Sequence, residues 1–355
     1  MACAGEDIIY AASRRGRVAA LDAATGKIKW EVKVRGIKIV KKEDPPEWAL
    51  EYKKKEKKKF KWLKRKEKTK SRISKPMPYG AAADENGVYL GFDDGTFRSF
   101  AAADGKERWR MNLKSAVVSA PTLWEGLVYF IAGDDTLYAV DAQTGKWKWQ
   151  YKRETRKRMT IMGLPRPVIN GRTVFFGASD GVVAALDALT GELLWGKRPE
   201  ANRRRFEDID STPSVTKDLV FLATYDGYVF AIDRSSGQVK WSFEQGSIEP
   251  IAMAGDLVIV SGQDNRIHAL KASTGQEVWK ATCHKAKSSL SGAVSLGNRV
   301  IFGSSWGKLV ILDANDGKKL ARFRTWGGIT GSPLIVGGKV FVIDGRGQVE
   351  AFALD

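Results

Sequence analysis

The two residue types that build most metal and redox sites are scarce in this chain of 355 residues, which contains two cysteines and two histidines. Cys3 and Cys283 lie far apart in the sequence, and neither belongs to a Cys-x-x-Cys pair. The sequence therefore predicts neither a disulfide framework nor a zinc site, and this cysteine usage favours a reducing compartment.

Long hydrophobic runs are also missing. No stretch of about 18 apolar residues occurs, so the sequence contains no candidate transmembrane helix. The first strand is expected to begin by Ile8, which leaves no room for a signal peptide before it. We therefore expect a cytoplasmic protein. The start Ala2-Cys3-Ala4-Gly5 is similar to the end of a lipoprotein signal, so a periplasmic or envelope location is the alternative.

Motifs that carry catalysis are absent as well. The chain has no Gly-Lys-Ser/Thr phosphate loop, no Gly-x-Ser-x-Gly elbow and no His-Glu-x-x-His helix. His268 falls in a strand where sibling segments carry Tyr138 and Phe230, which predicts a packed strand residue, and His284 falls in a connection. We expect no catalytic residue, no bound metal and no cofactor.

A repeated pattern is present along the whole chain instead. An apolar strand, a Gly-containing turn and a second strand ending in Leu/Ile-Asp are followed by Ala-x-Thr-Gly-x-x-x-Trp, as in Leu21 to Trp30. The turn glycines are Gly26, Gly105, Gly145, Gly191, Gly237, Gly275 and Gly317, spaced by 79, 40, 46, 46, 38 and 42 residues. Removing an insertion of about 35 residues brings the first interval into line with the others.

This period predicts an all-β fold made of propeller blades. The turn glycines supply the positive φ that a tight hairpin requires, and the tryptophans are expected to fill the wedge between adjacent blades. The segments Ser119-Ala120-Pro121, Ser211-Thr212-Pro213 and Ser332-Pro333 should mark innermost strands. Counting Met1–Gly5 as one of these gives a single eight-bladed β-propeller over residues 1–355, whose last blade has three strands. Seven blades is the alternative.

The repeat resembles that of the pyrroloquinoline-quinone-like (PQQ-like) propellers. Within that superfamily it is similar both to the quinoprotein dehydrogenases and to the non-catalytic branch, including the propeller lipoprotein of outer-membrane assembly. A dehydrogenase of this family needs a quinone, a calcium ion, a catalytic aspartate and commonly a vicinal cysteine pair. Cys3 and Cys283 cannot be vicinal, and no calcium-loop spacing is visible. The resemblance therefore implies the fold and favours a non-enzymatic scaffold, with quinone-dependent catalysis as a minor alternative.

Positive charge is concentrated in three segments. Residues 33–75, 152–158 and 197–205 carry net charges of +13, +4 and +4, whereas the whole chain carries +18. The rest of the chain is therefore slightly acidic. Each segment links the outer strand of one blade to the inner strand of the next, and 280–287 is a milder case. Because such links cross one face of a propeller, all four are expected on that face.

The segment 41–75 is predicted to be a basic insertion between the first two blades. Asp44-Pro45-Pro46-Glu47 is typical of a helix start, and the pattern continues to about Lys68. Trp48, Tyr52, Phe60 and Trp62 fall on one side of that helix, together with Ala49 and Leu63, and lysine covers the rest. These four aromatics are expected to seat the helix or to enter a partner.

Three interpretations of this charge remain open. The helix could dock on its own propeller, it could bind a polyanion, or it could meet an anionic membrane surface or an acidic protein. We expect polyanion binding, with RNA or a ribonucleoprotein as the partner, because lysine-rich segments neutralise phosphates and no base-reading motif is present. A protein-assembly scaffold of the envelope is the alternative, and no small-molecule substrate is expected. The expected phosphate-contacting residues are Lys53, Lys54, Lys55, Lys57, Lys58, Lys59, Lys64, Arg65, Lys66, Lys68, Lys70, Arg72, Arg156, Lys157, Arg158, Arg203, Arg204 and Arg205.

Overall fold

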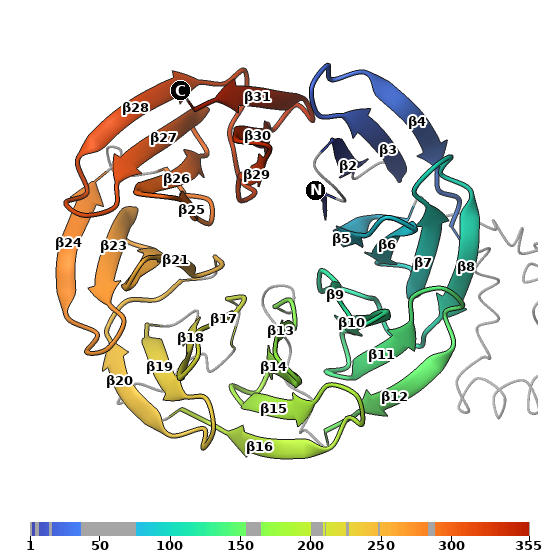
Figure 1. Ribbon diagram of the computed structural model, residues 1–355, viewed down its shortest axis with the longest axis horizontal. Helices are drawn as coiled ribbons and strands as arrows, with labels where there is room; N and C mark the ends of the chain where they lie inside the picture. The colour runs from blue at the N-terminus through green and yellow to red at the C-terminus, as the bar shows by residue number, and fades with distance from the viewer. Residues whose placement is uncertain are drawn as a thin grey trace, which may run out of the picture.

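The computed structural model is a ring of eight small antiparallel sheets around a central axis, with the chain running from the inner to the outer strand of each sheet (Figure 1). Seven sheets have four strands and the eighth has three. The predicted eight-bladed propeller is confirmed, and the seven-bladed alternative is wrong. The structure describes residues 2–3, 7–13, 16–36, 76–153, 165–199, 209, 211–224, 227–247, 249–282 and 288–354.

The blades are numbered here in chain order, and their strands are given from the axis outwards. Blades 1 to 4 consist of β1 (Ala2–Cys3), β2 (Ile8–Ser13), β3 (Arg17–Asp22), β4 (Ile28–Lys33); β5 (Pro78–Ala83), β6 (Gly87–Phe92), β7 (Thr96–Ala101), β8 (Glu107–Asn112); β9 (Thr122–Trp124), β10 (Leu127–Ile131), β11 (Leu137–Asp141), β12 (Trp147–Tyr151); and β13 (Val168–Asn170), β14 (Thr173–Gly177), β15 (Val183–Asp187), β16 (Leu193–Lys197).

Blades 5 to 8 follow the same plan, except that the last lacks a fourth strand. They consist of β17 (Ser214–Val215), β18 (Leu219–Ala223), β19 (Val229–Asp233), β20 (Val239–Phe243); β21 (Ala252–Ala254), β22 (Leu257–Ser261), β23 (Arg266–Lys271), β24 (Glu277–Thr282); β25 (Val294–Leu296), β26 (Arg299–Ser304), β27 (Lys308–Asp313), β28 (Lys319–Arg324); and β29 (Leu334–Val336), β30 (Lys339–Ile343), β31 (Val349–Ala353).

The aspartate of the repeat builds the turn between the third and fourth strands. In blade 3, Asp141 accepts hydrogen bonds from the backbone N–H of Thr144 at 2.9 Å and from its hydroxyl at 2.8 Å, and Gly145 follows at φ +70°. The hydroxyl bond is the main reason that the pKa of Asp141 lies below its usual value. Because Oδ1 of the carboxylate bonds within the turn, these recurring aspartates are turn residues, as the pattern predicts.

The tryptophan of each repeat joins its blade to the next one. Its indole N–H donates to a backbone carbonyl in the following blade's turn, and its ring lies against that turn's glycine. Six such docks occur among the described residues: Trp30 to Ala102 (2.8 Å), Trp109 to Ala142 (3.0 Å), Trp149 to Ala188 (2.9 Å), Trp195 to Arg234 (2.9 Å), Trp241 to Ala272 (2.8 Å) and Trp279 to Ala314 (2.7 Å). The expected structural role of the tryptophans is confirmed.

Two of the eight junctions have no tryptophan dock among the described residues: the seam between blades 8 and 1, and the junction between blades 7 and 8, where Ala321 occupies the tryptophan position. An apolar cluster lies between each pair of neighbouring blades, and the cluster between blades 6 and 7 contains thirteen buried residues. At the seam only Ile9, Val336 and Phe341 are buried together. Blade 8 has no tryptophan-bearing strand to dock on blade 1, so the ring closes there by side-by-side packing of two blades (Figure 1). This junction buries the smallest core in the molecule's described part.

The basic insertion 41–75 lies outside the described residues, and so does the helix predicted within it. Where the structure describes the chain, no helix is long and apolar enough to cross a membrane.

Candidate interaction surface

None of the sequence-predicted contact residues falls within the described part of the chain. The expected phosphate-contacting lysines and arginines and the four aromatics all belong to residues 41–75, 154–164 and 200–208. The structure therefore brings none of them together and tests none of their contacts.

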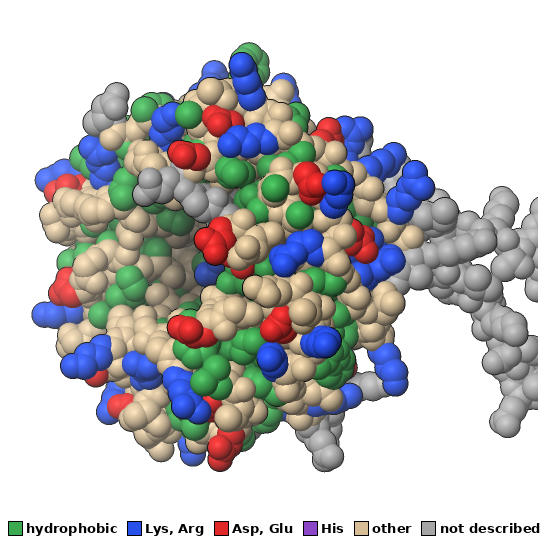
Figure 2. Space-filling model, turned by 45° about the vertical axis from the view of Figure 1, so that its right-hand side comes forward, with side chains coloured by type: hydrophobic (Ala, Val, Ile, Leu, Met, Phe, Trp, Pro, Cys, Tyr) green, Lys and Arg blue, Asp and Glu red, His purple; other side chains and the backbone are tan. Residues whose placement is uncertain are grey.

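The basic side chains at the described ends of these links form ion pairs with aspartates of the ring. Arg153 makes a two-pronged ion pair with Asp180, with N–O distances of 2.7 and 2.9 Å, and Arg198 approaches the same carboxylate at 3.6 Å. Lys152 lies 3.8 Å from Asp134. These acids belong to turns between second and third strands. They therefore partly neutralise the positive charge at the described ends of the links. Across the surface in Figure 2, Lys and Arg side chains alternate with Asp and Glu.

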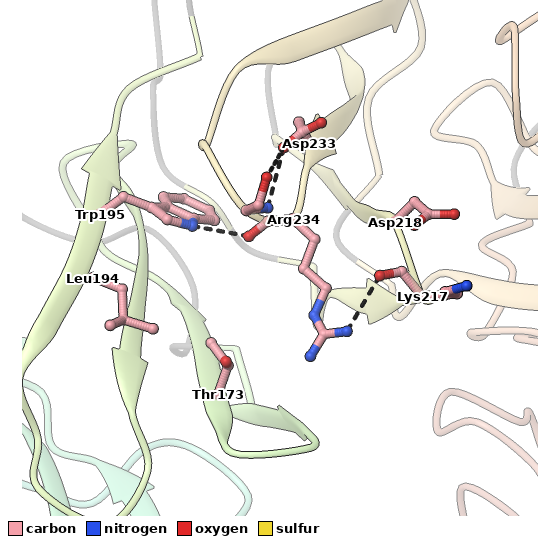
Figure 3. Close-up of a pocket in the computed structure, with 8 residues that line it drawn as sticks. Thr173, Leu194, Trp195, Lys217, Asp218, Asp233 and Arg234 are labelled. Carbon is pink, nitrogen blue, oxygen red and sulfur yellow. Dashed lines mark hydrogen bonds between the residues drawn. The ribbon is translucent and has the colours of Figure 1, made fainter.

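A hollow lies on the opposite face, where blades 4 and 5 meet (Figure 3). It has a volume of about 330 Å³. Its lining combines apolar, cationic and acidic groups: Thr173, Leu194, Trp195, Lys217, Asp218, Asp233, Arg234 and Ser235. It lies over the turns that join first to second strands and third to fourth strands.

Arg234 shapes this hollow because it replaces the alanine that accepts the docking tryptophan in the other five docks. Its carbonyl still accepts from Trp195, while its guanidinium donates to the carbonyl oxygens of Lys217 at 3.2 Å and Asn170 at 2.9 Å. The guanidinium carbon also lies 5.9 Å from the centre of the Phe175 ring. One side chain thus bridges blades 4 and 5 and forms a polar floor.

Asp233, beside Arg234, is held as a carboxylate. It accepts hydrogen bonds from the hydroxyls of Ser235 and Ser236 at 2.7 and 2.9 Å, and Lys240 lies 3.2 Å away. The Ser235 hydroxyl bond is the largest of the effects that keep the pKa of Asp233 well below its usual value. The hollow therefore keeps its negative charge throughout the physiological pH range.

Blade 4 exposes three leucines, of which Leu194 belongs to the lining of the hollow. Leu189, Leu193 and Leu194 are 46, 44 and 54% exposed, whereas the neighbouring Trp195 is buried. Exposed apolar side chains on the same face as polar groups are typical of protein–protein contact surfaces. We call the hollow and these three leucines the blade 4/5 surface.

Only weak signals of this surface are visible in the amino-acid sequence. Arg234 departs from the Asp-Ala-x-Thr-Gly pattern, and Leu193-Leu194 places two apolar residues in succession on a strand that alternates elsewhere. Both departures are visible in the sequence, but their proximity depends on which blades become neighbours.

His268 is a buried residue of β23, as predicted, but it has the acidic partners that sequence reasoning could not name. Its Nδ1 lies 2.7 Å from Glu277 and its Nε2 lies 3.1 Å from Asp264. Burial raises the pKa of Glu277, but the bond and charge of His268 outweigh that effect and leave it below its usual value. Since only 4% of His268 is exposed, the cluster joins strands and offers little access to a substrate.

Glu249 is a second unusual titratable group. It lies directly before the inner strand β21, and its Oε2 accepts a hydrogen bond from the Gly292 N–H at 2.7 Å. Burial raises the pKa of Glu249 to about 7. No group of three or more His, Cys, Asp or Glu side chains in the described ranges is arranged to hold a metal ion.

Comparison with protein families gives a match over nearly the whole chain. The matching family is described as outer membrane protein assembly factor BamB, and it covers residues 1–45, 59–281 and 263–355. The BamB proteins of Burkholderia pseudomallei strain K96243 and Legionella pneumophila strain Paris are 39 and 33% identical over 108 and 86 residues. These matches cover 30 and 24% of this chain, and 27 and 22% of the relatives' own length.

Solved structures show the same ring. BamB from Moraxella catarrhalis superposes with a TM-score of 0.75 at 23% identity, covering 98% of this chain and 92% of that one. The computationally designed Ika8 protein gives 0.73 at 17%, covering 99 and 95%. Quinohemoprotein alcohol dehydrogenase from Comamonas testosteroni gives 0.66 at 16%, covering 95 and 68%. The fold is thus shared by an assembly factor and an enzyme.

These findings correct the expected function and partner. The prediction of RNA or ribonucleoprotein binding is wrong, because the family and the relatives are described as outer membrane protein assembly factors. The error came from treating clustered lysine as a sign of phosphate, although positive charge does not distinguish nucleic acid from other acidic surfaces. This chain belongs to the PQQ-like β-propeller family of the outer membrane protein assembly factor BamB.

Proposed function

We propose that this protein is a non-enzymatic scaffold that helps to assemble outer membrane proteins in the bacterial envelope. The observation that carries the proposal is the family match over nearly the whole chain. An envelope location replaces the cytoplasmic one expected from the sequence, because the relatives are named for outer membrane protein assembly. The fold alone does not exclude catalysis, since an alcohol dehydrogenase shares it.

The blade 4/5 surface is the proposed contact with a protein partner. Its exposed leucines supply apolar area, and Lys217, Asp218 and Arg234 supply directional polar groups. Six interblade docks hold the surrounding turns in place, so a partner meets a largely preformed surface. Covering the three half-exposed leucines on binding contributes on the order of 0.7 to 1.5 kcal/mol of transfer free energy each, because about half of each residue is already buried.

The basic insertion 41–75 is proposed as a separate arm attached to the ring between blades 1 and 2. Its surplus of lysine fits an anionic membrane surface, where each basic residue near the headgroups contributes about 1 kcal/mol. Flotation with vesicles of anionic lipid, comparing the whole chain with a version lacking 41–75, tests this role. Equal flotation of the two proteins would remove the arm from the proposal.

Site-specific photocrosslinking in cells tests the blade 4/5 contact. A photoreactive residue placed at Leu194 is expected to capture a protein of the outer membrane assembly machinery. The matched control is Leu320 on blade 7, which is equally exposed at 53% against 54% for Leu194. Identical products from both positions, or cytosolic products only, would refute the proposed contact.

A further inference from the structure

Blade 7 differs from most other blades in the turn between its second and third strands. In blades 2, 3, 4 and 6 the residue before the positive-φ position of this turn is an aspartate that pairs with an arginine or lysine. These pairs are Asp94–Arg98 (3.2 Å), Asp134–Lys152 (3.8 Å), Asp180–Arg153 (2.7 Å) and Asp264–Arg266 (3.7 Å). In blade 7 the same position precedes Gly307, at φ +70°, and holds Trp306, which is 60% exposed. An exposed indole therefore replaces the turn acid.

Three cations gather on the two strands that follow this turn. Lys308 of β27 pairs directly with Arg324 of β28, and Arg322 lies two residues before Arg324 on the same strand. Residues that are opposite one another, or two apart on a strand, share one face of a sheet. Partial burial, together with the charges of Arg322 and Arg324, lowers the pKa of Lys308 below its usual value. Like charges placed this close together destabilise the folded blade.

The two arginines lack the acidic partners that comparable cations have in other blades. Among the described fourth strands and the residues that follow them, only blade 7 has a cation at both the first and the third position after the tryptophan position. Four single cations at these positions are paired: Arg110 with Glu107 (3.3 Å), Lys152 with Asp134 (3.8 Å), Arg198 with Asp180 (3.6 Å) and Lys280 with Glu277 (3.4 Å). Arg322 and Arg324 form no ion pair with a carboxylate in the described part of the chain.

Comparison with blade 4 places the indole beside these cations. There the turn acid Asp180 lies 3.6 Å from Arg198, which holds the position of Arg324. Trp306 holds the position of Asp180, so its turn lies next to Arg324 on the face that the blade-to-blade links cross. Leu320 lies near the other end of β28, toward the opposite face, and is not included. We call Trp306, Lys308, Arg322 and Arg324 the blade 7 patch.

We propose that the blade 7 patch binds an extended acidic segment of a partner protein, with carboxylates at alternate residues on Arg322 and Arg324 and an apolar side chain on Trp306. Alternate residues of an extended chain lie about 6.6 to 6.8 Å apart, which is also the spacing of the two arginines along β28. Each guanidinium offers a planar fork that accepts one carboxylate in a bidentate way. Bound acid also relieves the repulsion among the cations of the patch.

This arrangement favours a protein segment over a lipid surface. Attraction to anionic headgroups depends on the number of charges near the surface, and arginine and lysine serve it equally. Two arginines at strand spacing beside an exposed indole instead match the residue types that are enriched where proteins meet. The blade 7 patch is separate from the blade 4/5 surface, which lies over turns of the opposite face.

Two labelled peptides of equal composition test the patch on the whole chain. In one peptide glutamate alternates with threonine and a leucine follows; in the other the glutamates are contiguous. Because both peptides have the same charge, the general attraction of a chain with net charge +18 is the same for both. Fluorescence anisotropy at about 0.15 M salt compares their affinities. We expect the alternating peptide to bind about threefold more tightly or better.

Matched double variants locate the binding. Arg322→Gln with Arg324→Gln removes both guanidiniums, whereas Lys146→Gln with Lys148→Gln removes the same charge at the same spacing from exposed positions of blade 3. Binding of the alternating peptide should weaken about fivefold or more in the arginine variant and change little in the lysine variant. Trp306→Ala should weaken it about threefold, because the apolar contact is lost. Urea unfolding of each variant checks that it folds.

Several results would overturn the proposal. They are the absence of peptide binding up to about 1 mM, equal affinity for the alternating and contiguous peptides, and equal binding by the two double variants. Flotation with anionic vesicles that only the arginine variant loses would assign the patch to a lipid surface instead. Neither the peptides nor these variants alter the blade 4/5 surface, so failure here is distinguishable from failure of the proposed function.

Discussion

At the scale of single residues, each pair of a docking tryptophan and a turn glycine connects two neighbouring blades. Trp241 of blade 5 lies on Gly275 of blade 6 and donates to Ala272, and the other five docks repeat this arrangement. A buried indole contributes about 2 to 3 kcal/mol through the area that it removes from water. The six docks are alike, and no atom lies within 4 Å of a Cβ added at Gly26 of blade 1. Comparing Gly275 with Gly26 therefore measures what the contact with the tryptophan ring adds to stability.

The pair Gly275→Ala and Gly26→Ala makes that comparison. Both glycines have positive φ, +73° and +70°, so alanine causes similar backbone strain of about 1 kcal/mol at each. At Gly275 the new methyl group would also lie 2.6 Å from the Trp241 ring, which adds about 2 kcal/mol. Urea unfolding should therefore show a larger loss for Gly275→Ala. Equal losses would mean that the dock contributes little to stability.

Glu249 should make stability depend on pH. The folded chain binds its proton more tightly than the unfolded chain does, with a pKa of about 7 against 4.5. Stability contributed by this group is therefore present at low pH and is lost as the pH rises from about 4.5 through 7, on the order of 3 kcal/mol in all. The cause is burial of the carboxylate, which the hydrogen bond from the Gly292 N–H only partly offsets.

The substitution Glu249→Gln tests this assignment because it keeps an acceptor for the Gly292 N–H. The variant should match the parent chain near pH 5 and exceed it by about 1 to 3 kcal/mol near pH 8 in urea unfolding. Glu192→Gln, at an exposed position of blade 4, serves as the control and should leave the pH profile unchanged. A parallel pH profile for Glu249→Gln and the parent would contradict the assignment.

The sequence predicts the role of a single residue correctly where its contacts lie within a short segment of the chain. The turn aspartates, the positive-φ glycines and the packed His268 follow from short segments, and the structure confirms them. Arg234 and Glu249 were not predicted, because their roles depend on carbonyls and amides supplied by other blades or by segments far along the chain. Only the folded ring brings those groups together.

At the scale of strands and blades, the eighth blade is the exception that determines local stability. Seven blades have a fourth strand, which carries a docking tryptophan in six of them, and blade 8 has none. The sequence predicted this three-stranded blade because the repeat stops after its third strand. The missing strand also predicts closure by side-by-side packing or an atypical seam, but the sequence does not name the residues that meet there, since Phe341 and Ile9 come together only in the folded ring.

Hydrogen exchange should report the weak seam. Amides of β30, the central strand of blade 8, are expected to exchange faster than those of β18 in blade 5, although both strands are paired on two sides. The reason is that the seam cluster contains three buried residues, whereas the cluster between blades 4 and 5 contains nine. Native-state exchange measured by mass spectrometry checks this. Equal protection of β30 and β18 would show that closure is as strong as the other junctions.

At the scale of the whole molecule, the described ends of two basic links, Arg153 and Arg198, pair with Asp180 in a turn on one face, and the blade 4/5 surface lies over turns of the other. The charge pattern was visible in the sequence, but its interpretation as an RNA footprint was wrong. Net charge restricts the partner to something acidic and does not identify its class. The blade 4/5 surface, in contrast, depends on leucines and a single arginine that contribute almost nothing to composition.

Loss of function at the blade 4/5 surface should be separable from loss of fold. Leu194→Asp places a charge among the exposed leucines, while Leu320→Asp places the same charge on blade 7 at equal exposure. Both variants should keep the stability of the parent within about 0.5 kcal/mol, because both positions face solvent. Only Leu194→Asp should lose partner crosslinking. Loss of crosslinking by both variants, or by neither, would argue against this surface.

The central claim is that the protein assists the assembly of outer membrane proteins. The most direct measurement is the ratio of folded to unfolded outer membrane β-barrel proteins in cells, read from heat-modifiable mobility on gels after deletion of the gene. The account predicts that this ratio falls in the deletion strain, and that the parent chain and Leu320→Asp restore it while Leu194→Asp does not. An unchanged ratio after deletion would contradict the account.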